Sequence, residues 1–348
     1  MDACEQHLDI TIDENEIFDG VKGVIKKIRP SWPLQQLHFK TFTNGISNKL
    51  VGVWHLDRYT DMVLTRIYGN NTDLLVDRKK ELENIRILHK AGYTHCIYAT
   101  FNNGFAYQFL EGDTLTVEAV RDPQVYPLIA RRLAEMHKVE NENIPKEAFI
   151  WEKMEKYMEI MPRKFSDSLK QTKFEILIQP YAVLEKEYQI LKEELSTLDS
   201  PVVYAHNDLL LTNILYNRRK KSVAFIDYEY TAFNYQAFDI ANHFAEYAGL
   251  EPVPNYSLYP DKEFQKVWLR EYLRTYNATS EVSEEEVDKL YQEVAKFSPF
   301  PHFFWGCWSL IQSMHSTIDF DFLEYAAARF NEYFRRKEDI SELKIDNE

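Results

Sequence analysis

A group of polar residues between Tyr204 and Gly249 has the side chains needed to handle a phosphorylated ligand. The group contains His206, Asp208, Asn213, Asp227, Glu229, Asp239 and Glu246. Short apolar runs lie between these residues, and burying carboxylates beside such runs is costly unless the carboxylates bind something. Because Mg²⁺ prefers oxygen ligands, the species that fits is magnesium together with a phosphorylated nucleotide.

Three of these residues match the parts that phosphoryl transfer requires. The reaction needs one carboxylate that orients and deprotonates the attacking hydroxyl, and oxygen ligands that hold Mg²⁺ on the phosphates. Asp208 supplies the first, while Asn213 and Asp227 supply the second. Protein kinases carry an Asp, an Asn and a second Asp in the same order. The pattern therefore predicts a kinase-like enzyme that acts on small molecules.

The elements around these residues must display them at strand ends. Residues 202–205 and 222–226 are predicted to be short buried strands, and residues 213–216 a third. Each of these runs ends at a polar residue. Loops that follow the strands are therefore expected to carry the catalytic groups.

The preceding part of the chain predicts a small sheet with one helix. Residues 36–42, 61–68 and 107–110 have the pattern of strands. Residues 77–91 are predicted to form a helix, because apolar residues recur at helical spacing and Gly92 follows as a stop signal.

Beyond residue 111 the pattern is mostly helical. Helices are predicted at residues 125–137 and 174–195, and four more after the catalytic strands. The fold class is therefore α+β, with a small β-rich N-terminal lobe and a larger, mostly helical C-terminal lobe, as in protein kinases. The expected division is a tail at 1–14, a nucleotide-binding lobe at 15–111 and a catalytic and substrate-binding lobe at 112–348.

Four segments resemble the choline/ethanolamine kinase family. They are HNDLLLTN at 206–213, FIDYEYTAFNYQAFDIANHFAEYAG at 225–249, FFWGCWSLIQ at 303–312 and EYAAARF at 324–330. The resemblance extends over about residues 15 to 337. Two features are more similar to the ethanolamine-specific branch of the family. One is Leu209 and Leu210 directly after His-Asn-Asp, since choline kinases usually carry Gln at the position of Leu210. The other is the stretch at 248–261.

The resemblance implies an activity. It is the ATP- and Mg²⁺-dependent phosphorylation of the ethanolamine hydroxyl to phosphoethanolamine, which in this family begins phosphatidylethanolamine synthesis through CDP-ethanolamine. Choline kinase, or a kinase for both amines, is the nearest alternative. An inactive, nucleotide-binding regulatory protein is an alternative of another class, although competent residues fill all three catalytic positions.

The resemblance also implies nucleotide contacts. It matches the loop at 43–48 to the family's phosphate loop, with Asn44, Gly45, Ser47 and Asn48 as contacts. From the residues alone, an ordinary hairpin turn fits this loop equally well. The segment at 108–114 corresponds to the hinge that binds adenine, and Gln108 and Leu110 are the contacts expected there.

Arg66 is a charged residue within an apolar strand and needs a partner. By resemblance the partner is Glu81 on the following helix, as in the cation–glutamate pair that holds nucleotide phosphates in kinases. The alternative is an exposed arginine on a strand face, with Glu81 on a solvated face of the helix.

An amine substrate calls for acidic and aromatic side chains. The expected set is Asp208, Glu229, Tyr230, Glu246, Trp305, Trp308 and Tyr325. Trp305 and Trp308 are one helical turn apart and share a face. Glu246 is expected on the same helix as Asp239. Without the resemblance, aromatic residues at this spacing would be assigned to the hydrophobic core. His206 and Asp239 are expected to support the catalytic loop rather than to react.

Composition limits the classes of partner. The formal net charge of −14 over 348 residues argues against nucleic acid, which is bound through clustered Lys and Arg. Three scattered cysteines predict neither a disulfide framework nor a zinc site. The longest apolar runs fall short of the roughly 20 residues that span a bilayer, and residues 1–19 are too acidic for a targeting peptide. A cytoplasmic enzyme is expected, and a homodimer is left open.

Overall fold

The computed structural model describes residues 5–42, 48–69, 76–249, 251, 253–316 and 318–345, with the backbone alone at residue 48 and at 341–345. The chain divides into two compact units. The first unit contains Met1–Asp113, Asn217–Lys220 and Ala224–Glu229, and the second contains Thr114–Tyr216, Lys221–Val223 and Tyr230–Glu348.

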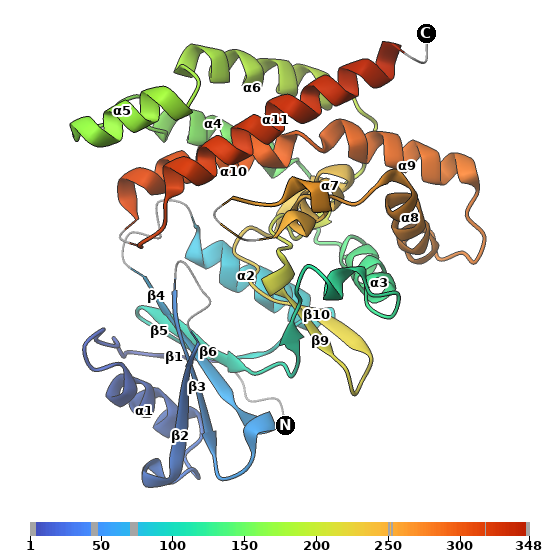
Figure 1. The fold of residues 1–348 in the computed structure, drawn as a ribbon. Helices are drawn as coiled ribbons and strands as arrows, with labels where there is room; N and C mark the ends of the chain where they lie inside the picture. The colour runs from blue at the N-terminus through green and yellow to red at the C-terminus, as the bar shows by residue number, and fades with distance from the viewer. Residues whose placement is uncertain are drawn as a thin grey trace. The chain divides into compact units, whose positions relative to one another are not determined.

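The first unit is built on a six-stranded sheet (Figure 1). Its strands are β1 Gln6–Leu8, β2 Leu37–Phe42, β3 Asn48–His55, β4 Val63–Tyr68, β5 Ile97–Phe101 and β6 Gly104–Gln108. Their order across the sheet is β1-β5-β6-β4-β3-β2. The pairs are antiparallel except that β1 runs parallel to β5.

Two helices accompany this sheet. The buried face of α1, Ile17–Ile28, packs with Val63 and Ile67 of β4 in one hydrophobic core. Because side chains alternate along a strand, Arg66 points to the opposite face, where it meets α2, Arg78–Lys90. The Asp77 side chain caps α2, and Gly92, at φ +80°, follows its end.

The second unit is mainly helical. Its α-helices are α3 Tyr126–Met136, α4 Phe149–Ile160, α5 Ser168–Leu177, α6 Tyr181–Ser196, α7 Gln236–Ala245, α8 Lys262–Tyr276, α9 Glu284–Phe297, α10 Phe300–His315 and α11 Phe322–Ile345. Every residue of α7 is buried. In Figure 1, α10 lies beside α11 and also packs on α4 and α7. The absence of a side chain at Gly306 allows this approach, since a Cβ there would lie 2.9 Å from the Phe330 ring.

Short strands carry the central loops. In the second unit, β8 Val202–Ala205 pairs antiparallel with β11 Ala232–Tyr235. The strands β7 Asp113–Thr114, β9 Ile214–Asn217 and β10 Ser222–Phe225 form a small sheet in the order β10-β9-β7. Short 3-10 turns occur at Leu34–Gln36, Tyr59–Asp61, Ala119–Arg121, Leu211–Asn213, Glu246–Ala248 and Tyr256–Leu258.

The predicted elements are confirmed where the pattern is strong. The strand at 202–205 is found at the expected residues, and the helices predicted at 77–91 and 125–137 are present within a residue of each predicted end. The α+β fold class, with a β-rich N-terminal part and a helical C-terminal part, is also confirmed. Among the described residues, no helix is long and apolar enough to cross a membrane.

Other expectations are wrong. The single helix expected at 174–195 is two helices, α5 and α6, because Pro180 has no backbone N–H and disfavours helix in the residue before it. Five α-helices, not four, follow the catalytic strands in the described part of the chain. The strand expected at 107–110 ends at Gln108.

Candidate active site

A cluster of charges in the first unit surrounds Arg66. Its guanidinium donates from Nη1 to Glu81 Oε1 at 2.5 Å and from Nη2 to Asp227 Oδ1 at 2.9 Å. The predicted pairing of Arg66 with Glu81 is confirmed, and the side chains are 12% and 0% exposed. The contact with Asp227, 161 residues away, was not predicted.

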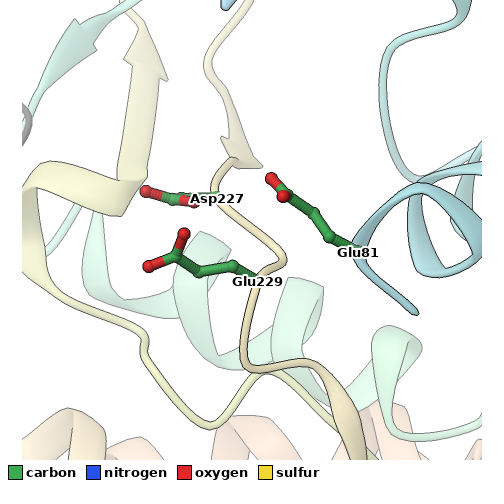
Figure 2. Close-up of side chains that lie close together, drawn as sticks. All are labelled: Glu81, Asp227 and Glu229. Atoms are coloured by element: carbon green, nitrogen blue, oxygen red, sulfur yellow. The ribbon is translucent and has the colours of Figure 1, made fainter. Parts of the chain in front are cut away.

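Arg78 provides a second bridge in this cluster. Its Nη1 donates to Glu81 Oε2 at 3.0 Å and to Glu229 Oε2 at 3.1 Å. Figure 2 shows Glu81 extending from α2 toward Asp227 and Glu229, which belong to the segment after β10. One carboxylate oxygen from each of these three residues lies within 4.8 Å of the other two. Carboxylate oxygens are the hard donors that a divalent cation prefers.

The cluster has more carboxylates than guanidiniums, and this shapes its titration. Burial, together with the neighbouring charge of Asp227, raises the pKa of Glu229 to about 7. Burial by itself lowers the pKa of Arg66, but the charges of Asp227 and Glu81 outweigh it and hold that pKa well above its usual value. A bound dication would relieve the excess negative charge, so the donor set fits a metal such as Mg²⁺.

Asp227 occupies an unusual backbone position. Its φ of +67° is uncommon for a residue other than glycine, and it follows the end of β10 directly after Ile226. The next residue holds this turn, because the Tyr228 hydroxyl donates to the Phe225 carbonyl at 2.6 Å. The turn thus fixes the direction of the Asp227 carboxylate.

In the second unit, Asp239 supports the loop that carries Asp208. The Asp239 carboxylate accepts the backbone N–H groups of His206 at 2.9 Å and Asn207 at 2.7 Å. It also contacts His137 Nε2 at 2.8 Å, and the other ring nitrogen of His137 lies 2.6 Å from the Tyr272 hydroxyl. Although burial alone would raise the pKa of Asp239, the hydrogen bond from His137 lowers it below its usual value. The supporting role expected of Asp239 is confirmed.

Asn207, directly before Asp208, is fixed in a left-handed conformation. Its φ is +64°, a region that asparagine tolerates better than most residues. Its amide donates to the Tyr230 carbonyl at 3.0 Å and accepts from Asn234 at 2.7 Å. Its backbone carbonyl accepts from Asn242 at 3.1 Å. These three contacts determine where the chain presents Asp208.

Asp208 and Asn213 are joined within this loop. The Asn213 Nδ2 donates to the backbone carbonyl of Asp208 at 2.8 Å. This bond uses the amide nitrogen and leaves the amide oxygen as an acceptor suited to a metal ion. Both residues are largely buried, at 8% and 7% exposure. His243 secures the next residue by contacting the Leu209 carbonyl through Nδ1 at 3.1 Å.

Aromatic residues of the second unit form a continuous series. The Tyr230 and Trp305 ring centroids are 5.4 Å apart, and those of Trp305 and Trp308 are 5.7 Å apart. The series continues through Phe322 and Phe320 to Tyr325. The contact between the two tryptophans, expected from their spacing, is confirmed.

Glu246 is placed differently from the expectation. Helix α7 ends at Ala245, and Glu246 begins a 3-10 turn instead of continuing the helix. Its Oε1 accepts from Arg329 Nη2 at 2.7 Å, and both side chains are buried. Arg329 also donates to the Tyr325 hydroxyl from Nε at 2.9 Å and Nη2 at 2.6 Å. Among the described residues, the buried Glu246 Oε2 has no hydrogen-bond partner.

The expected nucleotide contacts are described only in part. Asn44, Gly45 and Ser47 lie outside the described residues, and Asn48 begins β3 with its side chain outside them. Gln108 ends β6, where its backbone N–H donates to the Cys96 carbonyl at 3.1 Å, and Leu110 follows two residues later. The roles of these residues stay predictions.

The sequence interpretation missed several contributors. They are His137, Asn207, Asn234, Asn242, Arg78 and Arg329. Arg329 stands in the apolar run EYAAARF, and a charge in such a run signals a buried partner. The asparagines gave no comparable signal, since their partners are backbone groups and side chains distant in the sequence.

A β-rich unit with a buried Arg–Glu pair, and a helical unit with an anchored Asp and Asn loop, define a kinase-like phosphotransferase for small molecules. Residues 39–334 match the model of the choline/ethanolamine kinase family. The chain belongs to this family.

Individual relatives are similar over nearly the whole chain. Ethanolamine kinase 1 of Mus musculus is 45% identical over 347 residues, which cover 97% of this chain and 95% of the relative. A probable ethanolamine kinase of Nematostella vectensis is 42% identical and covers 97% and 98%. The solved ethanolamine kinase of Plasmodium vivax is 31% identical, with a TM-score of 0.81 and coverage of 92% and 89%.

Proposed function

We propose that this enzyme transfers the γ-phosphoryl group of ATP to the hydroxyl of ethanolamine, giving phosphoethanolamine and ADP. The observation that carries the proposal is the 45% identity, across almost the full length of both chains, to a protein named ethanolamine kinase 1. Phosphoethanolamine would then serve the synthesis of phosphatidylethanolamine. The reaction requires a base, a phosphate-binding cation and an amine pocket, and we propose residues for each.

Asp208 is the proposed base. It would accept the proton of the ethanolamine hydroxyl as the oxygen attacks phosphorus. A base of this kind must hold its direction, and the anchored backbone of Asn207 supplies that constraint. Asn213 then fixes the carbonyl of Asp208 itself.

Asn213 and Asp227 are the proposed ligands of Mg²⁺, with Glu229 as a further polar contact for substrate. A bound Mg²⁺ would supply positive charge that offsets charge developing on the phosphates. Arg66 would steady the phosphates, because Glu81 and Asp227 hold its guanidinium in one orientation. The nucleotide itself is assigned to Asn44, Gly45, Ser47, Asn48, Gln108 and Leu110.

The amine pocket is proposed from the aromatic series and Glu246. A cation over an aromatic face gains about 0.5–2 kcal/mol per ring. Tyr230, Trp305, Trp308 and Tyr325 would supply the rings. The free oxygen of Glu246 would accept a hydrogen bond from the ammonium group, which a quaternary amine could not donate.

The remaining proposals concern organisation. Residues 15–111 would form the nucleotide-binding lobe and residues 112–348 the catalytic and substrate-binding lobe, after a tail at 1–14. We place the enzyme in the cytoplasm.

Phosphate transfer by the purified protein tests the function. The protein is incubated with ATP, Mg²⁺ and ethanolamine, and ³¹P NMR follows the products. We expect a phosphomonoester signal of phosphoethanolamine that grows in step with ADP. An Asp208→Asn variant, which should lose about 10²- to 10⁴-fold in turnover, is the control for contaminating kinases. ATP hydrolysis without phosphoethanolamine, or no turnover at all, would overturn the proposal.

A further inference from the structure

Trp305 contacts more than its aromatic neighbours. Its indole Nε1–H donates to Asn242 Oδ1 at 2.8 Å, and both side chains are buried. The other end of the same amide, Asn242 Nδ2, donates to the backbone carbonyl of Asn207 at 3.1 Å. A chain of two hydrogen bonds therefore leads from helix α10, through α7, to the residue that precedes Asp208.

The chemistry of the groups fixes the direction of both bonds. An indole N–H can only donate, and a backbone carbonyl can only accept. An asparagine amide satisfies both neighbours in one of its two flip orientations and neither in the other. The Trp305 N–H thus selects the orientation in which Nδ2 faces the Asn207 carbonyl.

The end of this chain is the most constrained point of the loop. Asn207 has a φ of +64°, and the peptide that follows it leads directly into Asp208. Asp239 holds the N–H side of Asn207, and Asn242 holds its carbonyl side. Loss of either contact leaves the backbone free to relax toward a more common conformation.

We infer that Trp305 is a positioning residue for the catalytic loop, in addition to being a wall of the amine pocket. It acts through Asn242 on the Asn207–Asp208 peptide. The same side chain would therefore contact the bound amine and fix the position of the base. The inference rests on the proposed function, because that function assigns Asp208 as the base and the aromatic residues as the amine pocket. The hydrogen-bonded connection itself does not depend on the substrate.

Trp308 and Trp151 provide contrasts within the same unit. Trp308 stands one turn further along α10 and touches Trp305, but its Nε1 has no hydrogen-bond partner among the described residues. Trp151 of α4 stacks on Phe300 of α10 and donates its N–H to the Tyr235 hydroxyl at 3.2 Å. Among the described residues, the indole N–H groups of Trp308 and Trp151 form no hydrogen bond with Asn242.

The test compares Trp305→Phe, Trp308→Phe and Trp151→Phe in the full-length protein. Trp305→Phe should lower kcat by about 10- to 100-fold, because small displacements of a catalytic group carry losses of this size. Its KM for ethanolamine should change by a smaller factor. Trp308→Phe should instead raise KM and largely keep kcat, and Trp151→Phe should match the parent enzyme.

Hydrogen–deuterium exchange supplies a readout that needs no activity. The peptide containing residues 206–208 should exchange faster in Trp305→Phe and at the parent rate in Trp151→Phe. Replacing Trp305 with 3-benzothienylalanine, which keeps the ring size and removes the N–H, should give the same exchange and kcat changes without an altered fold. Adding Asn242→Leu to Trp305→Phe should cause little further loss.

The outcomes separate the two claims. If the parent enzyme makes no phosphoethanolamine, the proposed function fails, while the exchange data still decide the connection. The inference is overturned if residues 206–208 exchange at the same rate in Trp305→Phe as in Trp151→Phe, or if Trp305→Phe changes KM and not kcat. Trp305 would then only line the amine pocket.

Discussion

Single residues determine the balance of charge in the first unit. Three carboxylates lie together there, those of Glu81, Asp227 and Glu229. The guanidiniums of Arg66 and Arg78 form ion pairs with all three. Glu81 is saturated, since both of its oxygens accept from arginine. Asp227 is partly exposed and accepts from Arg66 through one oxygen. Asp227 is therefore the member of the cluster best placed to offer its second oxygen to a metal ion.

Replacing Asp227 with Ala should impair the use of metal more than the binding of amine. The change removes a hard oxygen ligand, so the Mg²⁺ concentration for half-maximal activity should rise, by about tenfold for each 1.4 kcal/mol of binding lost. The KM for ethanolamine should change less. An Mg²⁺ activation curve that coincides with that of the parent would show that Asp227 is not a ligand.

The proposed amine pocket should distinguish a substrate that donates hydrogen bonds from one that only contacts aromatic rings. Glu246→Gln should raise KM more for ethanolamine than for choline, because only a primary ammonium donates to the carboxylate. Trp308→Leu should have the opposite bias, since a quaternary ammonium depends on aromatic faces.

The pocket variants need a control for folding. Glu246→Gln leaves the buried Arg329 without its counter-ion, which destabilises the fold. The ratio of the two KM values is the measured quantity, because it does not depend on the fraction of folded enzyme. If each variant raises the KM for both amines by the same factor, Glu246 and Trp308 only maintain packing.

The sequence predicted those site residues whose signal is local or lies in a long family motif. Arg66 stood out as a charge in an apolar strand, and the two tryptophans as a one-turn pair. The contacts of Arg329 with Glu246 and of Arg66 with Asp227 could not be predicted, because 83 and 161 residues separate the partners. Only the folded chain brings these charges together.

At the scale of elements, helix α7 organises the loop that carries Asp208. Its first turn supplies Asp239 to the backbone N–H groups of His206 and Asn207, and its second half supplies Asn242 and His243 to carbonyls of the same loop. A helix buried on all sides can carry such polar groups because the loop satisfies them.

Asp239→Asn should weaken both the fold and catalysis. Its amide nitrogen would face a backbone N–H, so at least one charge-assisted hydrogen bond is lost, with a cost of about 1.5–3 kcal/mol in the free energy of unfolding. The kcat should fall because the Asp208 loop loosens. Urea unfolding and steady-state kinetics measure the two effects.

Ser283→Ala is the matched control for that experiment. Ser283 and Glu286 form a capping box at the start of α9, so its loss should cost about 1 kcal/mol of stability. Turnover should not change. If Asp239→Asn and Ser283→Ala lower kcat to the same extent, Asp239 has no specific connection to the loop.

Element boundaries were predictable where periodicity and stop signals agree. The helix from Arg78 has an aspartate cap and a following glycine, and both signals are local. The break between α5 and α6 was missed, although Pro180 marks it, because apolar residues continue at helical spacing on both sides. Helix α1 was missed because its two glycines lower its helix propensity, and packing on the sheet stabilises it.

At the scale of the whole molecule, buried histidines link stability to pH. Burial lowers the pKa of His243 to about 4 and that of His95 to about 3. A histidine whose pKa is depressed in the folded state contributes stability that is present above its unfolded pKa of about 6.5 and is lost as pH falls. The protein should therefore lose stability between about pH 6.5 and pH 4.

His243→Asn should reduce this loss. The Asn amide can keep the hydrogen bond to the Leu209 carbonyl but does not titrate. Between pH 7 and pH 5, the parent should lose about 2 kcal/mol more unfolding free energy than the variant. Urea melts at both pH values measure the difference, and His38→Asn at the surface controls for the exchange itself. Identical pH dependence in parent and His243→Asn would contradict the assignment.

The preference between two amines tests the proposed function most directly. The purified enzyme receives ATP and Mg²⁺ with ethanolamine and choline at equal concentration, and mass spectrometry counts both phosphorylated products over time. The proposed function predicts that phosphoethanolamine forms in clear excess over phosphocholine. Phosphocholine in excess would make the chain a choline kinase, and failure to phosphorylate either amine would contradict an active enzyme of this family.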